Sequence, residues 1–253
     1  MVSVCIPTYN GAKYIKEQLE SILSQLGIND EVIISDDQSS DNTLEIIREF
    51  HDPRIIILSH PKTNQKFTYG YTANNLEYAL GAAKGDYIFL SDQDDVWLPD
   101  KLKLFMRTFA DADIVLSDCT IVDKCLNVLY SSKFKLEGVK VSPFNNLIHC
   151  GYLGCCMAFK RGLLQWILPF PTNVPHDLWI GLVGEKVGRF KMLRESTLLY
   201  RRHDFNVSAT NNLLLNKNDQ LPRNNNSIFF KIHYRLFVIH SYLKFLIKFS
   251  RTK

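Results

Sequence analysis

The chain lacks the long apolar run of a membrane protein and the cysteine spacing of a metal or redox motif. None of its 253 residues lies in a window near the roughly 20 uncharged apolar residues that a membrane-spanning helix needs. The apolar stretch at 2–6 is too short for a secretory signal peptide and ends at Pro7. The six cysteines show no C-x-x-C spacing, and several lie in apolar runs typical of buried free thiols. We therefore expect reduced cysteines and a cytoplasmic protein whose membrane contact is peripheral.

Negative charge is absent from the C-terminal end. Residues 223–253 contain seven Lys and Arg and no Asp or Glu, whereas residues 1–222 hold 23 Lys and Arg and 26 Asp and Glu. A composition of 46% hydrophobic and 22% charged residues is that of a globular protein and excludes disordered and collagen-like classes. The body is thus mildly acidic and carries no nucleic-acid recognition motif, which argues against nucleic-acid binding.

The first hundred residues alternate between two hydrophobic periods. Strand patterns occur at 2–6, 31–35, 54–58 and 86–91, and helical patterns at about 15–26, 44–50 and 72–83, with Pro99 suited to open a further helix. Strands that alternate with helices predict an α/β fold in which helices cover both faces of a mostly parallel sheet.

The regular alternation of strand and helix patterns ends after residue 117. The sequence predicts a strand or hairpin over 120–130, a small-residue loop at 150–156, a proline-rich loop leading to a helix at 178–187, and a last strand at 191–200. We expect a catalytic domain over 1–210, a linker rich in Asn and Leu at 211–227, and a basic helical tail at 228–253.

Polar residues follow three of the predicted strands, with PTYNG at 7–11, SDDQSSD at 35–41 and SDQDD at 91–95. Ligands of open α/β sheets bind beyond the carboxyl ends of parallel strands. We therefore expect the three segments to share one rim of the sheet beside a ligand cleft.

Three carboxylates crowd into Asp92, Asp94 and Asp95, where they repel one another and raise each other's pKa. A hard divalent cation such as Mg²⁺ or Mn²⁺ would offset that repulsion. On this stretch alone an equal interpretation is that Asp94 or Asp95 caps the helix near Pro99 and the rest is solvated loop.

The second acidic segment allows two interpretations as well. The Asp37 carboxylate can accept an N–H of a nucleobase, or it can bond to its own backbone in a turn. Asp41 is better placed to cap the following helix.

Taken together, IPTYNG, SDDQSSDNT, SDQDDVW, the small-residue loop and the pair His176-Asp177 resemble the inverting family 2 glycosyltransferases of the GT-A fold, over roughly residues 2–210. With HDLW and YRRH downstream, the chain is most similar to the bacterial surface-polysaccharide branch, which includes rhamnosyl- and glucosyltransferases. The resemblance implies a donor such as UDP-glucose, UDP-galactose or dTDP-rhamnose. It also implies a lipid-pyrophosphate-linked saccharide as acceptor, in O-antigen or capsule synthesis at the cytoplasmic face of the inner membrane.

The resemblance implies roles for individual residues. The donor would be bound by Pro7, Tyr9 stacked on the base, Asp37 bonded to the base, Asp92 toward the ribose and sugar, and Gly151 and Gly154 beside the sugars. Mn²⁺ or Mg²⁺ would be held by Asp94, with Asp92 and His203 as further ligands and Asp95 as an additional acid. His203 has an alternative interpretation as a surface histidine.

The family's base sits in a Glu-Asp pair, and this chain has His176-Asp177 in its place. Asp177 would take the acceptor proton during a single displacement that inverts the sugar, and His176 would be accessory. A nucleotidyltransferase, which needs no such base, and a catalytically silent nucleotide- or sugar-binding protein are the alternatives.

Two aromatic and basic features complete the expectations. Trp97 and Trp179 would stack on sugars or pack in the core, and the core is the better assignment for Trp97.

In the tail, Lys231 and Arg235 share one helical face and Lys244, Lys248 and Arg251 lie nearly opposite, which predicts two amphipathic helices with a break near 240–241. We favour contact of this tail with anionic lipid over packing on the domain.

Overall fold

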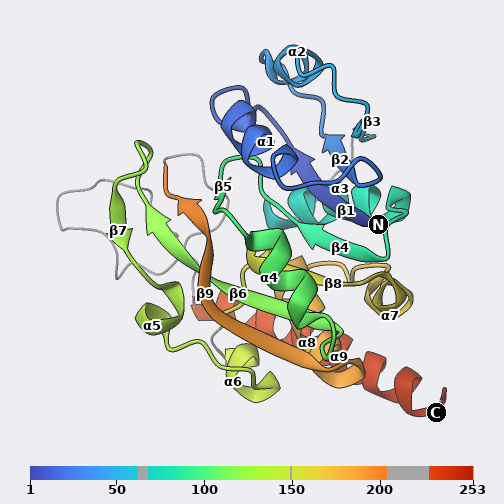
Figure 1. Ribbon diagram of the computed structural model, residues 1–253. Coiled ribbons are helices and arrows are strands. Elements are labelled where there is room, and N and C mark those ends of the chain that lie inside the picture. Colours follow the sequence, from blue (N-terminus) through green and yellow to red (C-terminus); the bar gives the residue numbers. More distant parts are fainter. Residues whose placement is uncertain (62–67, 149, 204–227, 253) are drawn as a thin grey trace.

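The computed structural model describes residues 1–61, 68–148, 150–203 and 228–252, so the predicted linker at 211–227 lies outside the described residues. These residues form a nine-stranded sheet (Figure 1). Its order is β3 (Ile55–Ser59), β2 (Glu31–Asp36), β1 (Val2–Thr8), β4 (Tyr87–Leu90), β8 (Met157–Lys160), β6 (Ile114–Val122), β9 (Phe190–Arg201) and β5 (Val96–Trp97), with β7 (Val128–Tyr130) paired to β6.

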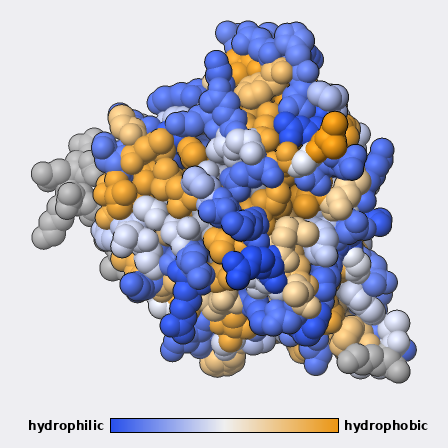
Figure 2. All heavy atoms as spheres, viewed as in Figure 1, coloured by the Kyte–Doolittle hydropathy of each residue, from blue (hydrophilic) through white to orange (hydrophobic). Residues whose placement is uncertain are grey.

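The predicted α/β fold is confirmed, but the sheet is mixed rather than mostly parallel, because four of its strand pairings are parallel and four are antiparallel. Strands β3, β2, β1 and β4 run parallel, and β6 and β9 are also parallel to each other. The shorter β8, β5 and β7 are antiparallel to their partners. The predicted hairpin over 120–130 is formed by β6 and β7, and Val128 and Leu129 of β7 are exposed. Figure 2 shows that hydrophobic side chains also gather at other places on this face of the molecule, among hydrophilic ones.

Helices cover both faces because neighbouring strand residues point to opposite sides. Val4 and Ile6 of β1 belong to a core under α1 (Ile15–Leu23), α2 (Thr43–Arg48) and α4 (Lys101–Thr108). Cys5, between them, belongs to a second core under α3 (Thr68–Ala82), α8 (His176–Val187) and α9 (Ile228–Ser250). The remaining helical segments are α5 (Lys133–Glu137), α6 (Pro143–Ile148), α7 (Leu164–Ile167) and the 3₁₀ turns η1 (Gly154–Cys156) and η2 (Arg161–Leu163).

Three helices begin at other residues than the sequence predicts. Helix α3 starts at Thr68, about four residues before its predicted start. Helix α4 starts at Lys101, because Asp100 adopts a left-handed conformation with φ of 67°. Helix α8 starts at His176 rather than residue 178, directly after the extended Pro175. His176 and Asp177 therefore lie in the first helical turn and not in the loop before it.

The C-terminal tail forms one continuous helix, so the predicted break near His240 is wrong. Val238, Phe245 and Phe249 recur on one face of α9 and are buried against the domain. Phe249 contacts the Trp166 ring edge-on at 5.1 Å between centroids. The predicted break was based on the positions of the cations, whereas the buried face of α9 with its aromatic side chains determines how the helix packs on the domain. The tail therefore packs on the domain, which was the alternative to the favoured contact with lipid. No described helix is long and apolar enough to cross a membrane.

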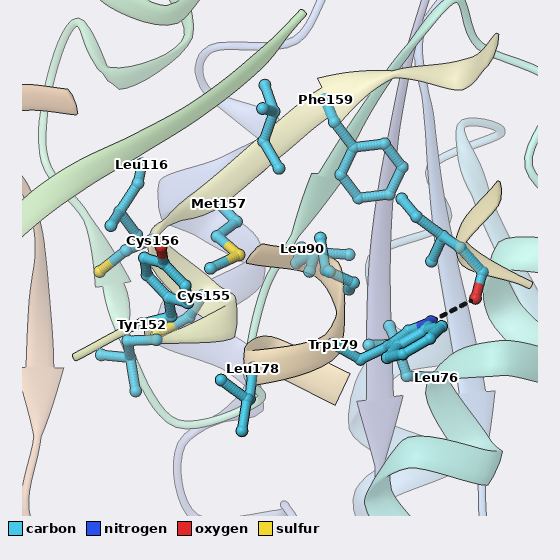
Figure 3. Packing of buried hydrophobic residues seen from close by; sticks show 14 of the residues in the cluster. Leu76, Leu90, Leu116, Tyr152, Cys155, Cys156, Met157, Phe159, Leu178 and Trp179 are labelled. Atoms are coloured by element: carbon cyan, nitrogen blue, oxygen red, sulfur yellow. Dashed lines mark hydrogen bonds between the residues drawn. The ribbon is translucent and has the colours of Figure 1, made fainter. Parts of the chain in front are cut away.

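Both tryptophans considered for sugar stacking lie in the core. Trp97 is buried beside Phe89, at 5.6 Å between ring centroids. Trp179 is buried too, and its Nε1–H donates to the Ile167 carbonyl at 2.9 Å, the dashed line in Figure 3. Neither indole is therefore available to a ligand.

Candidate active site

The three polar strand ends share one rim, as the sequence predicts. Strand β1 lies between β2 and β4, with Thr8 paired to Asp36 and Cys5 paired to Leu90. Because these strands are parallel, the segments that follow them leave the sheet on the same side. The segment after β4 carries the acidic cluster.

Gln93 joins the β1 and β4 segments through both ends of its amide. Its Nε2 donates to the Tyr9 carbonyl at 3.0 Å, and its Oε1 accepts the Tyr9 N–H at 2.9 Å. A Cβ atom at Gly11 would lie 2.5 Å from that Oε1, so only glycine leaves room for the bridge. The Tyr9 ring is 55% exposed and Pro7 is partly exposed, so both remain accessible to a ligand.

The β1 and β2 segments are joined by short polar side chains. Asn10 accepts the Ser40 N–H at 2.8 Å, and Asp36 accepts the Ser39 N–H at 2.9 Å. Asp41 accepts the N–H of Thr43, the first residue of α2, at 3.1 Å, but the N-cap residue of this helix is Asn42, so the prediction of Asp41 as the cap is wrong by one residue. The turn-forming carboxylate is that of Asp36, so the turn interpretation of Asp37 is wrong.

Asp37 instead pairs with a histidine that the sequence analysis overlooked. Oδ1 of Asp37 lies 2.9 Å from Nδ1 of His60, and Nε2 of the same ring lies 2.8 Å from Oδ1 of the Asn74 side-chain amide. His60 follows β3, the one strand of the first four whose end was not considered. A polar residue after that strand was the available signal.

Asp94 and His203 are brought together from positions 109 residues apart. Oδ2 of Asp94 lies 2.7 Å from Nε2 of His203, whose ring stacks on Tyr14 at 4.8 Å between centroids. His203 is therefore not the surface histidine of the alternative interpretation. Neither Asp94 nor Asp95 caps α4, because the residue before that helix is Asp100.

Asp92 and Asp95 form a second group with the Cys155 thiol, their ligand atoms all within 4.8 Å of one another. Burial, then the charge of Asp94, raises the pKa of Asp92 to about 7. Burial and the charges of Asp94 and Asp92 also raise the pKa of Asp95 well above its usual range. The cost of this crowded negative charge would fall if a cation were present.

The donor set fits a hard divalent ion. Within the described residues, Oδ2 of the fully buried Asp95 has no hydrogen-bond partner, which is costly for a carboxylate without a cation nearby. Asp94 and His203 form a separate pair beside the group of Asp92 and Asp95, and together these side chains offer carboxylates and an imidazole, which Mn²⁺ accepts, whereas Mg²⁺ prefers the carboxylates. The sulfur of Cys155 suits neither ion.

Arg201, at the end of β9, holds the acidic segment in place. Its backbone N–H donates to Asp95 at 3.0 Å, and its Nε donates to the Asp94 carbonyl at 2.8 Å. The guanidinium also pairs with Glu17 and lies 4.6 Å from the centre of the Tyr14 ring. The sequence analysis includes Arg201 only as part of YRRH, because none of these contacts is local.

Two buried lysines anchor the small-residue loop at 151–156. Nζ of Lys101 donates to the Cys155 carbonyl at 2.8 Å, and Nζ of Lys133 donates to the Gly151 carbonyl at 3.1 Å. Burial lowers the pKa of Lys101. Figure 3 shows Cys155 and Cys156 packed among Tyr152, Met157 and Leu116. The loop is thereby fixed against the acidic segment.

Gly154 brings this loop against the start of α8. A Cβ atom there would lie 2.8 Å from Nε2 of His176 and 4.0 Å from Cβ of Asp177. Burial lowers the pKa of His176, so the ring is neutral near pH 7. Asp177 is close enough to Asp92 for its charge to raise the pKa of Asp92 as well. Gly151 lies in the same loop but further from the acidic segment, because its backbone bonds to Asn146 and Lys133 and a Cβ atom there would meet Val139.

Comparison with known proteins identifies the family. The model of glycosyl transferase family 2 matches residues 3–168. The chain belongs to this family. Among its relatives, the dTDP-rhamnosyl transferase RfbG of Shigella flexneri is 43% identical to this glycosyltransferase over 218 residues, covering 81% of this chain and 73% of RfbG. The Escherichia coli glucosyltransferase WfaP, which acts on UDP-Glc and α-D-GlcNAc-diphosphoundecaprenol, is 28% identical over 96% of this chain and 92% of WfaP.

Other relatives are much longer. The glycosyltransferase matches the Pasteurella multocida chondroitin synthase at 34% identity over 83% of this chain but only 22% of that protein. Solved structures share the GT-A fold: Staphylococcus aureus TarS with UDP-GlcNAc has a TM-score of 0.63 at 21% identity, covering 83% of this chain and 61% of TarS. A Pyrobaculum calidifontis mannosyltransferase with GDP-Man and Mn²⁺ has a TM-score of 0.57 at 24% identity, covering 78% and 56%.

Proposed function

We propose that this family 2 glycosyltransferase is metal-dependent and inverts the sugar it transfers. The observation that carries the proposal is the pairing of Asp94 with His203 on the sheet rim, at 2.7 Å between Oδ2 and Nε2. This pair offers ligands to an ion, and Asp177 lies near enough for its charge to raise the pKa of Asp92, so a carboxylate that can act as a base belongs to the same site.

The residues divide the chemistry between them. Tyr9 and Asp37 bind the base of the donor, and Asp92 lies toward its ribose and sugar. Asp94 and His203 would hold Mn²⁺ or Mg²⁺, and the bound ion would supply positive charge to the diphosphate leaving group. Asp177 accepts the proton of the acceptor hydroxyl as that oxygen attacks the anomeric carbon from the side opposite the diphosphate. A single displacement of this kind inverts the anomeric configuration.

The relatives support the choice of substrates. RfbG is named for a dTDP-rhamnosyl donor, and WfaP for UDP-Glc and a lipid-diphosphate acceptor. We propose dTDP-rhamnose, UDP-glucose or UDP-galactose as donor for this chain, and a lipid-pyrophosphate-linked saccharide of O-antigen or capsule synthesis as acceptor.

Helix α9 supports a peripheral position at the cytoplasmic face of the membrane. Opposite its buried face it exposes the apolar side chains of Leu236, Ile239, Leu243 and Ile247. At about 100° per residue these fall on one stripe, and the exposed Lys244, Lys248 and Arg251 follow directly beside it. An apolar stripe next to a row of cations suits a surface of anionic lipid, with apolar side chains in the acyl boundary and cations at the headgroups.

The transferase proposal is tested by nucleoside diphosphate release from a panel of sugar nucleotides, with and without Mn²⁺ or Mg²⁺, in the presence of lipid-pyrophosphate saccharide analogues. Metal-dependent release from one donor, with a product of inverted configuration by NMR, is expected. Release of pyrophosphate from a nucleoside triphosphate would favour a nucleotidyltransferase. Donor binding without turnover across the whole panel would favour a silent binding protein.

The membrane proposal is tested by flotation with vesicles of phosphatidylglycerol and phosphatidylethanolamine against vesicles of phosphatidylcholine alone. The wild-type protein should float with the anionic vesicles, and the double variant Leu243→Ser, Ile247→Ser should not. Ile28→Ser is the matched control, because Ile28 is equally apolar and 89% exposed but lies in the loop before β2. Equal flotation of the double variant and the control would refute the assignment of this face.

A further inference from the structure

His60 is held more rigidly than a histidine at a strand end needs to be. Its side chain is 2% exposed, and its backbone N–H continues the sheet by donating to the Asp36 carbonyl at 2.8 Å. The ring meets Tyr78 of α3 edge-on at 5.5 Å between centroids. The imidazole therefore has one orientation, with Nδ1 toward Asp37 and Nε2 toward Asn74.

This orientation fixes the role of Nδ1. If Asn74 presents its carbonyl oxygen, the ring carries protons on both nitrogens, and if Asn74 presents its amide nitrogen, only Nδ1 is protonated. In both arrangements Nδ1–H donates to Oδ1 of Asp37. Among the described residues Oδ2 of Asp37 makes no hydrogen bond, and the side chain is partly exposed on the rim beside Tyr9.

One free carboxylate oxygen selects among bases. Uracil and thymine each present a single imide N–H, whereas guanine presents two neighbouring N–H donors that a carboxylate with two free oxygens would bind as a pair. Since His60 already donates to Oδ1, only Oδ2 of Asp37 is unshared, and the second donor of guanine would have to share Oδ1 with His60. A shared acceptor in a fixed geometry binds the second donor more weakly, so the paired contact with guanine is disfavoured relative to the single contact with a pyrimidine.

We infer that His60 is a positioning and specificity-determining residue, which orients Asp37 so that the donor site takes pyrimidine nucleoside diphosphates in preference to guanosine diphosphate. This inference rests on the proposed function, because it assumes that Asp37 meets the base of the donor. It adds a residue and a physical reason for the choice of base.

The amide variants of His60 separate positioning from space filling. Asn places its side-chain nitrogen where Nδ1 lies and keeps the bond to Asp37, whereas the longer Gln reaches toward the position of Nε2 and Asn74. Either amide side chain can be accommodated at residue 60, because this position lines a cavity of about 550 Å³ together with Leu58, Asn74 and Tyr78. A residue needed only for packing would be replaced by Gln at least as well as by Asn.

The experiment measures the dissociation constants of UDP, dTDP and GDP by calorimetry for the wild-type protein, His60→Asn, His60→Gln and Asn74→Ala, together with the thermal midpoint of each. We expect the wild type and His60→Asn to prefer UDP or dTDP over GDP by about 10-fold or more. His60→Gln should lose about 10-fold in pyrimidine affinity and most of the preference, with Asn74→Ala in between.

The outcomes distinguish a failure of the role of His60 from a failure of the proposed transferase function. Equal UDP affinities of His60→Asn and His60→Gln, or an unchanged UDP-to-GDP ratio in His60→Gln, would overturn the role of His60 and leave the transferase proposal intact. Absence of nucleoside diphosphate binding by the wild-type protein would overturn the proposed function itself. Thermal midpoints within a few degrees of one another exclude misfolding as the cause of a lost affinity.

Discussion

The backbone N–H of Arg201 donates a hydrogen bond to the Asp95 carboxylate at 3.0 Å, although 106 residues separate the two. The guanidinium of the same residue donates to the Asp94 carbonyl at 2.8 Å and to the Lys124 carbonyl at 3.1 Å. The strand that ends at Arg201 thus shapes the acidic segment that follows β4, and it delivers His203 beside Asp94 two residues later.

Arg201→Lys should weaken both the fold and the metal site. A lysine keeps the charge but cannot reach the carbonyls and Glu17 together, because it lacks the planar fork of donors. We expect a loss of ~2–4 kcal/mol of unfolding free energy and about a 10-fold loss in Mn²⁺ affinity, measured by denaturant titration and calorimetry. Arg202→Lys is the control. An equal effect of the two variants would contradict the role of Arg201 in holding the acidic segment.

Gly11→Ala and Gln93→Ala should be non-additive. The added methyl at residue 11 meets Oε1 of Gln93 at 2.5 Å, so Gly11→Ala alone should cost ~1–3 kcal/mol. In a Gln93→Ala background the clash is gone, and Gly11→Ala should cost far less. A double-mutant cycle by denaturant titration measures this coupling, and additive costs would show that the Gln93 amide is free to move away.

Removal of a carboxylate or imidazole at the ion site should reduce metal affinity. We expect Asp94→Asn and His203→Ala to lose about 10- to 100-fold in Mn²⁺ affinity, read from the electron paramagnetic resonance signal of free Mn²⁺, without activity entering the measurement. Asp86→Asn is the control, because Asp86 is exposed and lies at the far end of β4. Wild-type affinity in both site variants would place the ion elsewhere.

Asp177→Asn should separate donor binding from transfer. The amide has the shape of the carboxylate but cannot take a proton, so turnover should fall by about 10²- to 10⁴-fold while UDP or dTDP binds as before. Single-turnover kinetics and calorimetry report the two quantities. Unchanged turnover would exclude Asp177 as the base.

Glu185 of α8 should destabilise the protein above neutral pH. Burial raises its pKa to about 7, and no described residue bonds its Oε1. The folded state therefore binds a proton that the unfolded chain releases at a lower pH, so the stability cost grows as pH rises from about 4.5 to 7 and then stays constant. Glu185→Gln should gain ~1–2 kcal/mol at about pH 8 and almost nothing near pH 4, by thermal melts at both values. An equal gain in stability at both pH values would show that Glu185→Gln acts through packing and not through the removed charge.

Local pattern predicted the fold because both signals of the sheet are local. The period of two in 2–6 and 31–35, and the helical period after each, depend only on the face that each residue presents to the core. The rule that ligands meet the carboxyl ends of parallel strands then brought Tyr9, Asp37 and Asp92 to one rim. The exact starts of α4 and α8 escaped, because they depend on single backbone conformations at Asp100 and Pro175.

The sequence by itself determined the strand and helix order, the acidic rim and the family resemblance, since each of these rests on neighbouring residues. Tertiary structure alone decided the pairs His60 with Asp37 and Arg201 with Asp95, and the single helix α9. Partners so distant in the chain are chosen by sheet order and by aromatic packing on the domain. No local pattern of charge or hydrophobicity encodes that choice.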